Sequence, residues 1–305
     1  MTLTETPPVE ATPAARRRRP LAILTRAVPA LVVVTVLAVL WEGYKAVGQA
    51  LDDKVPLVHW GFPVGTNDVA MPHLWSIVGA LFDKTQNGGA VAPLWRILLD
   101  GALFTLREAF VGFVAGAVVG VALAVVFQLV PLLGRALLPW IVVSQTIPFV
   151  ATAPMVVIWG GRMGWDAWLS VSVIAGYLVF FPVVVNVRRG LATADVASLE
   201  LMRSYAAGRW QTLFRLRFFV ALPYLFAGLK LGAAGAVVGA IVGELPSGQG
   251  KGVGRLLLTF TSFFNLAPER LFAAVAAAAL LGLGFVGCVG LVERLVLGPR
   301  AKELA

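Results

Sequence analysis

Residues 103–127 read LFTLREAFVGFVAGAVVGVALAVVF, an apolar run in which Arg107 and Glu108 are the only charged residues. The run is longer than the ~20 residues that cross a hydrocarbon core as a helix. A spanning strand would instead be ~10 residues long and would alternate between polar and apolar residues. The run therefore predicts a transmembrane helix. Arg107 and Glu108 lie near its start, where we expect an interfacial anchor and a local ion pair.

Apolar runs of comparable length recur along the chain. Hydrophobic residues make up 59% of the 305 residues and charged residues 13%, whereas soluble domains carry roughly 25% charged residues. So few charges cannot cover a water-facing surface, and lipid is the expected solvent. We predict an all-α integral membrane protein with about six transmembrane helices. The further runs cover 27–47, 136–159, 167–187, 221–243 and 271–292.

Small residues recur at helical spacing inside these runs. Because lipid gives helices little hydrophobic reason to associate, close backbone contact at small residues supplies the packing. We therefore expect a compact bundle. The stripes are Gly112, Gly116 and Gly120 in one run and Gly235, Gly239 and Gly243 in another.

The flanks and the first connector are less apolar than the runs. A removed secretory signal is the alternative to an uncleaved first helix, but such a signal has an apolar core of only ~7–15 residues. Segment 74–82 contains Trp75 and predicts a short interfacial helix. The expected organisation is a disordered basic cytoplasmic tail at 1–20, a first transmembrane helix at 21–47, an external connector at 48–102, a membrane domain at 103–297 and a cytoplasmic tail at 298–305.

The net charge of +9 comes from basic residues in short connectors rather than on one polar face. That distribution argues against a nucleic-acid partner. Connectors rich in Lys and Arg stay on the cytoplasmic side of a membrane. With both termini cytoplasmic, the tight clusters at 16–19, 188–189 and 203–217 all lie inside, so this is the expected orientation.

Polar residues inside the spans are candidates for the lining of a pore. Such groups are costly in lipid and are often functional. Hydrogen bonding between helices explains Ser and Thr equally well, and Lys230 is expected to extend its amine to the interface. We favour Gln145, Thr146 and Glu244 from a set that also contains Ser144 and Tyr177.

The residues offer little for enzymatic chemistry. Cys288 is the only cysteine and predicts a small buried hydrophobe, while His59 and His73 lack ligand spacing, so we expect no metal site. Lys251 lies in a glycine-rich stretch that resembles a phosphate loop, but no Ser or Thr follows it. We interpret that stretch as a flexible external connector.

Segment 195–223, DVASLELMRSYAAGRWQTLFRLRFFVALP, differs from the other connectors. Asp195 can cap a first helix, and Leu199, Met202 and Tyr205 recur at helical spacing. A small-residue turn precedes a second helix in which aromatic and basic residues alternate. The pattern is typical of a surface that docks a cytoplasmic partner, and it also suits a helix lying on anionic lipid. The residues alone leave both interpretations open.

This segment resembles the coupling motif in permeases of binding-protein-dependent ABC importers of the type I fold, and the resemblance covers roughly residues 70–297. Within that family, 204–205, 222–225 and 243–246 look most like permeases of pyrimidine or riboflavin uptake, in the nitrate, sulfonate and taurine branch. The resemblance favours docking and makes 103–297 the permease domain. It implies that the residues contacting an ATPase are Glu200, Ser204, Tyr205, Ala206, Ala207, Gly208, Arg209 and Trp210.

The segment departs from the family pattern at its turn. Ala206 stands where the family has Gly, and alanine resists the positive φ that a glycine turn requires. We therefore expect Gly208 to supply the turn instead.

The resemblance implies a permease subunit in a bacterial inner membrane that has no ATPase site and no cofactor of its own. A cytoplasmic ATPase dimer would hydrolyse ATP, and an external solute-binding protein would deliver a small solute. Two copies of this chain would form the translocation path. The solute would be a sulfonate, nitrate, a pyrimidine or a riboflavin-like compound. The alternative, an ion-coupled secondary transporter, requires ionisable groups near the bilayer midplane.

Overall fold

The computed structural model describes residues 19–51, 65–87 and 90–298. The predicted tails at 1–20 and 298–305 lie almost entirely outside these residues. The chain divides into two units, Met1–Ser76 and Ile77–Ala305. Each unit is described by itself.

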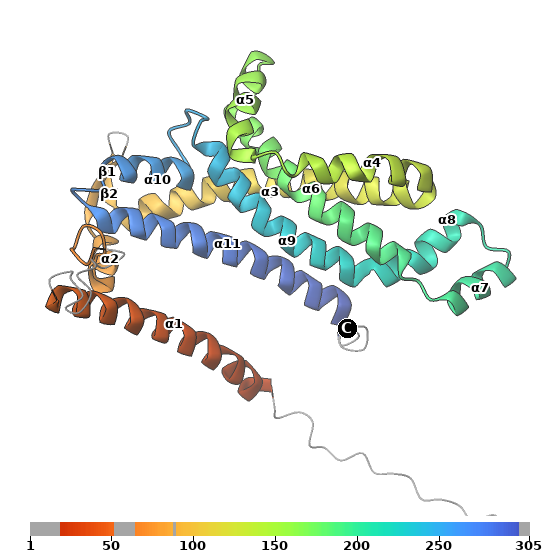
Figure 1. The fold of residues 1–305 in the computed structure, drawn as a ribbon, viewed down its shortest axis with the longest axis horizontal. Helices are drawn as coiled ribbons and strands as arrows, with labels where there is room; N and C mark the ends of the chain where they lie inside the picture. Colours follow the sequence, from red (N-terminus) through yellow and green to blue (C-terminus); the bar gives the residue numbers. More distant parts are fainter. Residues whose placement is uncertain (1–18, 52–64, 88–89, 299–305) are drawn as a thin grey trace, which may run out of the picture. The chain divides into compact units, whose positions relative to one another are not determined.

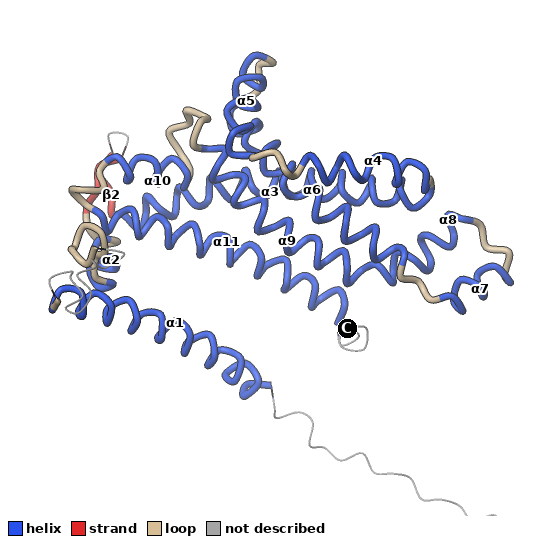
Figure 2. The backbone as a smooth tube through the Cα atoms, in the orientation of Figure 1, coloured by secondary structure: helices blue, strands red, loops and turns tan. Residues whose placement is uncertain are grey.

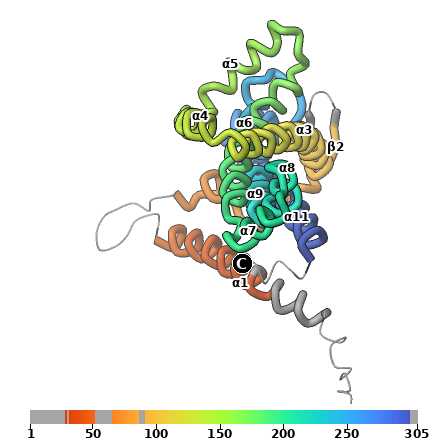
Figure 3. Tube along the Cα trace, turned by 90° about the vertical axis from the view of Figure 1, so that its right-hand side faces the viewer, coloured from red at the N-terminus to blue at the C-terminus, as the bar shows by residue number. Residues whose placement is uncertain are grey.

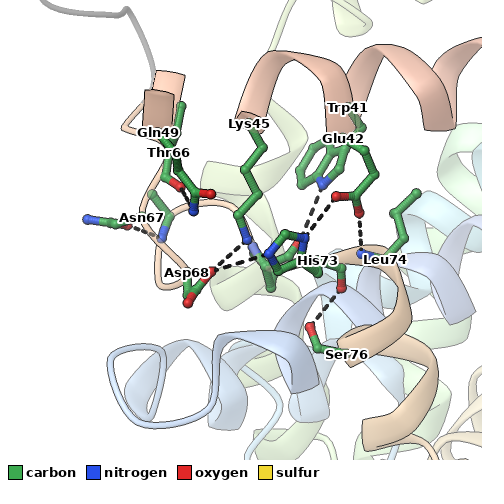
Figure 4. A network of polar contacts seen from close by, with 12 residues as sticks. Trp41, Glu42, Lys45, Gln49, Thr66, Asn67, Asp68, His73, Leu74 and Ser76 are labelled. Atoms are coloured by element: carbon green, nitrogen blue, oxygen red, sulfur yellow. Dashed lines mark hydrogen bonds and ion pairs between the residues drawn. The ribbon is translucent and has the colours of Figure 1, made fainter. Parts of the chain in front are cut away.

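The first unit contains helix α1 (Arg19–Ala50), whose residues Leu31–Ala50 are apolar and long enough to span a membrane. A polar network joins the end of this helix to segment 65–76 (Figure 4). Glu42 accepts a 2.8 Å hydrogen bond from the Leu74 N–H and lies 2.8 Å from Nδ1 of His73. Lys45 is fully buried and donates to Asp68 at 2.6 Å. The network thus holds segment 65–76 against α1.

The second unit is a helical bundle with one short hairpin (Figures 1 and 2). Its strands pair antiparallel, with Lys84 opposite Pro93. Helix α2, which begins in the first unit, confirms a helix within the predicted segment 74–82. The elements are α2 (Leu74–Ala80), β1 (Lys84–Asn87), β2 (Ala90–Pro93), α3 (Leu94–Leu129), α4 (Pro131–Ser144), α5 (Phe149–Arg162), α6 (Ala167–Ala192), α7 (Val196–Ser204), α8 (Arg209–Thr212), the π-helical η1 (Leu213–Arg217), α9 (Phe218–Glu244), α10 (Val253–Ser262) and α11 (Pro268–Leu297).

The number of apolar helices confirms the predicted count of spans. Among the described residues, five helices are long and apolar enough to cross a membrane, or six if α4 and α5 form one bent span. The prediction of a single helix over 136–159 is wrong, because α4 and α5 meet at an angle of 98°. Pro148 explains the break: it has no N–H to donate and disfavours helical backbone in the residue before it.

The core of the second unit forms where α3 and α9 pack against α6. Figure 3 shows these three helices together near the centre of the bundle. A Cβ atom added at Gly120 of α3 would come within 2.8 Å of the Val183 side chain of α6. A Cβ atom added at Gly239 of α9 would come within 2.9 Å of the Ala175 backbone of α6. The glycine stripes therefore allow close helix contact, as their spacing predicted.

Candidate coupling surface and translocation residues

Helices α7 and α8 lie at the end of the second unit opposite the hairpin and α10 (Figure 1). They connect α6 to α9, which are two of the three core helices. Asp195 directly precedes α7, but its side chain makes no capping hydrogen bond, contrary to the prediction. Its negative charge still lies at the positive end of the helix, a favourable position.

The turn after α7 is built on Ala206. This residue has φ +49°, whereas Gly208 has φ −68°, so the prediction that Gly208 takes the left-handed position is wrong. The Ala207 N–H donates to the Met202 carbonyl at 3.0 Å and the Ala206 N–H to the Arg203 carbonyl at 2.9 Å. This pair of bonds is the Schellman motif, which usually has Gly at its left-handed residue.

Gly208 begins the second helix of the pair instead. Its N–H donates to Oε1 of Gln211 at 3.1 Å, which satisfies a donor at the helix start. One turn further, the rings of Trp210 and Phe214 are stacked with centroids 5.8 Å apart. The sequence motif thus forms a helix, a tight turn and a second helix.

The surface of this helix pair carries aromatic and charged side chains. Tyr205 is 75% exposed and Trp210 60% exposed. Glu200, Ser204 and Arg209 are exposed as well. The residues that the family motif marks as contacts therefore lie together on one free end of the unit.

The helix pair is rigidly attached to the bundle. Leu213 is buried in the core, and Nη1 of Arg217 donates to the Leu191 carbonyl at the end of α6, 2.7 Å away. From Arg209 to Glu244 the backbone is helical without interruption through α8, η1 and α9. A force on the exposed pair would therefore act directly on a core helix.

The pore candidates Gln145 and Thr146 lie at the bend between α4 and α5. Gln145 is half-buried and Thr146 exposed. The Tyr177 hydroxyl of α6 donates to the Ser144 carbonyl, so the bend is hydrogen-bonded to the core. Four of the five polar residues singled out in the spans thus gather at one place in the fold.

Glu244, the remaining candidate, lies elsewhere and is fully buried. Its Oε1 accepts from the Thr105 hydroxyl and its Oε2 from the Gly254 N–H, both at 2.6 Å. The Val253 N–H donates to Thr105 Oγ1 at 2.9 Å. Glu244 and Thr105 thus accept hydrogen bonds from the first two N–H groups of α10. These bonds hold the end of the predicted flexible connector in place. These bonds account for Glu244 within the fold, and its role in a pore stays a prediction.

Glu108 is fully buried beside Glu244, with which it interacts directly. Its Oε1 accepts from Gln249 at 3.3 Å, and its Oε2 has no hydrogen-bond partner among the described residues. The expected local pair with Arg107 is wrong, because the Arg107 guanidinium lies 4.6 Å from the Trp168 ring centroid. A carboxylate inside an apolar run is a signal for a buried partner, and the prediction of an interfacial pair with Arg107 missed it.

Lys230 Nζ forms an ion pair with Glu293 at 2.9 Å, and its position at an interface stays a prediction. One further prediction is corrected. Cys288 is exposed on α11 rather than buried. Among the described residues, His, Cys, Asp and Glu form no cluster of three that could bind a metal, and His59 lies outside those residues.

Comparisons with known proteins agree with the helical architecture. Residues 112–297 match the family described as "Binding-protein-dependent transport system inner membrane component". A crystal structure of an amino acid ABC transporter with histidines aligns with a TM-score of 0.54 at 16% identity, covering 66% of this chain and 94% of that one. At that identity the likeness concerns the fold alone.

Several relatives are bacterial permeases. The riboflavin transport system permease protein RibX of Chloroflexus aurantiacus is 31% identical over 208 residues, covering 67% of this chain and 75% of RibX. The formylaminopyrimidine transport permease protein ThiX of Halalkalibacterium halodurans is 31% identical over 199 residues, covering 65% and 77%. The putative aliphatic sulfonates transport permease protein SsuC of Bacillus subtilis is 27% identical over 234 residues, covering 73% and 82%.

Proposed function

The chain belongs to the family of inner membrane components of binding-protein-dependent transport systems, and from this premise we propose that its α7–α8 surface couples an ATPase to the uptake of a small solute. The chain is a multi-pass permease component of an ABC transporter and not its ATPase. Such systems work with a separate ATPase and a binding protein. We propose which residues of this chain contact the ATPase and how that contact acts on the translocation path.

The exposed aromatic pair formed by Trp210 of α8 and Phe214 of η1 carries the proposal. Trp210 and Phe214 are stacked and largely exposed, in a segment whose next residues are buried or bonded to α6. Exposed aromatics of this kind are typical anchors of protein interfaces. Docking of a partner here would move α8, η1 and α9 together, because they form one continuous helix.

The alternative is an interfacial helix lying on anionic lipid, which the exposed Arg203, Arg209 and Arg215 would suit and an exposed carboxylate opposes. Glu200 is exposed on α7, on the same free end as the aromatic residues. A carboxylate next to an anionic membrane surface is repelled. A protein partner with a basic or hydrogen-bonding counterpart to Glu200 accommodates it better.

The translocation path is proposed to form between two copies of the chain. The bent α4–α5 pair exposes Trp140, Ile147 and Trp159, which are 72%, 51% and 57% exposed. An apolar face of this size next to the half-buried Gln145 supports pairing with a second subunit, with Gln145 and Thr146 near the path. Both termini would then lie in the cytoplasm, with α7 and α8.

The solute is proposed to be one of the small compounds that the relatives' names give. Those names include riboflavin, formylaminopyrimidine, aliphatic sulfonates and nitrate. Identity is higher to the riboflavin and formylaminopyrimidine permeases, at 31% each, than to the sulfonate permease, at 27%. This order favours a planar nitrogen heterocycle.

Reconstitution tests the proposal. The chain is incorporated into proteoliposomes with its ATPase, the binding protein is added outside, and uptake of a labelled pyrimidine or flavin is measured. We expect uptake only with ATP enclosed and with the binding protein present. Uptake by the chain alone, driven by a proton or sodium gradient, would instead support the secondary-transporter alternative.

A further inference from the structure

A cavity of about 510 Å³ lies where α3 ends, α4 begins and α6 ends. Its lining includes Gln128 at the end of α3, Pro131 and Arg135 of α4, and Arg188 and Arg189 of α6. We name it the arginine cavity. At the end of the unit that carries α7 and α8, α3 and α6 end and α4 begins (Figure 1).

The charges of the arginine cavity are uncompensated. Its lining holds three arginines and no Asp or Glu. In the part of the chain that the structure describes, the ion pairs involve Lys45, His73 and Lys230, so none of the three arginines has a carboxylate partner. An anion entering the cavity would therefore meet a concentrated positive charge.

Arg188 lies partly inside the protein, which distinguishes the arginine cavity from a basic patch on the surface. It is half-buried, and a Cβ atom added at Gly134 would lie 3.6 Å from its Nη2. The guanidinium therefore lies next to the first turn of α4. That turn is also the positive end of the α4 dipole. Membrane orientation requires only that basic residues be present and does not explain this placement.

The surroundings of the arginine cavity are those of a lipid-facing site. On α4, next to Pro131 and Arg135, Leu132 is 76% exposed and Leu137 43% exposed. Within the cavity itself, Phe127 and Leu138 contribute apolar lining. A ligand with a phosphate group and an acyl chain would match both parts of this environment.

We propose that the arginine cavity binds a phosphate group, which we assign to the headgroup of an anionic phospholipid. The guanidinium groups of the arginines would bind the phosphate oxygens, and the acyl chains would lie along the exposed apolar residues of α4. Arginine suits such a site because its planar fork bonds two phosphate oxygens at once. Basic pockets between transmembrane helices on the cytoplasmic side bind lipid headgroups in this way. The proposal does not depend on the ATPase contact at α7 and α8.

Native mass spectrometry of the purified full chain tests the assignment. The chain is titrated with phosphatidylglycerol and, separately, with phosphatidylcholine. We expect tighter binding of phosphatidylglycerol, and about 25-fold weaker binding in Arg135→Gln/Arg188→Gln, taking about fivefold for each arginine. Arg188→Lys, which keeps the charge but loses the fork, should weaken binding less than Arg188→Gln.

The matched control removes two positive charges elsewhere. Arg162 and Arg294 are exposed and do not line the arginine cavity, so Arg162→Gln/Arg294→Gln should bind phosphatidylglycerol like the unaltered chain. Should the double variant at Arg135 and Arg188 unfold, the single variant at the exposed Arg135 still reports the loss. Binding of phosphatidylglycerol that neither Arg135→Gln nor the double variant weakens would overturn the proposal.

A parallel titration separates lipid from free phosphate. Inorganic phosphate is added to the detergent-solubilised chain while thermal unfolding is followed. A stabilisation that is lost in Arg135→Gln/Arg188→Gln, without any preference for phosphatidylglycerol, would support the phosphate site and overturn its assignment to lipid. No effect of phosphate together with selective phosphatidylglycerol binding supports the assignment as stated.

Discussion

The Thr105 hydroxyl donates a 2.6 Å hydrogen bond to Glu244, a residue 139 positions later in the chain. The bond links α3 to the end of α9, and the same Thr105 oxygen accepts from the first N–H of α10. Glu244 therefore joins three helices through groups that are all buried. Such a contact is expensive to break, because each buried donor would lose its acceptor.

Isosteric variants separate the two buried glutamates. Glu244→Gln replaces one oxygen by an amide that cannot accept from both Thr105 and Gly254, so we expect a loss of about 1–3 kcal/mol in unfolding free energy. Glu108→Gln keeps the oxygen that accepts from Gln249 and can donate to Glu244, so its loss in unfolding free energy should be smaller than that of Glu244→Gln. Thermal unfolding of the purified chain measures both. Equal losses for the two variants would contradict this account of the pair.

The turn at Ala206 predicts a stabilising substitution. Ala206→Gly removes the steric cost of a left-handed residue and should increase stability by about 1 kcal/mol. Ala207→Gly is the matched control: its φ is not positive, so it should lower stability by about 0.5–1 kcal/mol. Hydrogen exchange of α7 and α8 measures the local effect. A gain from both substitutions would mean that the turn carries no strain at Ala206.

The polar network that clamps segment 65–76 to α1 should have a stability that depends on pH. The hydrogen bond and charge of Lys45 hold the pKa of the exposed Asp68 carboxyl below its ordinary value. Because the folded value is the lower one, this contribution to stability is fully present above the unfolded value. It is lost as the pH falls through the lowered value, so the clamp should weaken below about pH 4.

Hydrogen exchange of segment 65–76, corrected for the intrinsic effect of pH, follows the loss of this clamp. Asp68→Asn should exchange faster at neutral pH and should show no further acid-dependent change from this pair. Protection in Asp68→Asn equal to that of the unaltered chain would show that the ion pair does not hold the segment.

The sequence predicted the helices of the membrane part well because run length and apolarity are local properties. The exception is 136–159, where the polar residues Ser144, Gln145 and Thr146 followed by Pro148 mark the break inside an otherwise apolar run. The angle of the break depends on contacts of the bend with α6, including the hydrogen bond from Tyr177. Hydropathy carries no information on that angle.

The position of the exposed surface was predicted from the sequence, but the contact between the buried glutamates and the conformation of the turn were not. The exposed surface around Trp210 followed from an amphipathic pattern and a family motif within one segment. The contact between Glu108 and Glu244 joins residues from different helices, and no local pattern encodes it. Ala206 was misjudged because propensity disfavours a left-handed alanine, while the two hydrogen bonds of the Schellman motif hold it there.

The coupling role of the α7–α8 surface is tested most directly by Trp210→Ala in the reconstituted transporter, with ATPase binding and solute uptake measured together. Phe219→Ala is the matched control, since Phe219 is 63% exposed on α9 and lies outside the proposed surface. We predict that Trp210→Ala weakens ATPase association about 30-fold, as for an anchor of about 2 kcal/mol, and abolishes stimulated uptake. Phe219→Ala should leave both unchanged. Unaltered association and uptake in Trp210→Ala would contradict the proposed coupling surface.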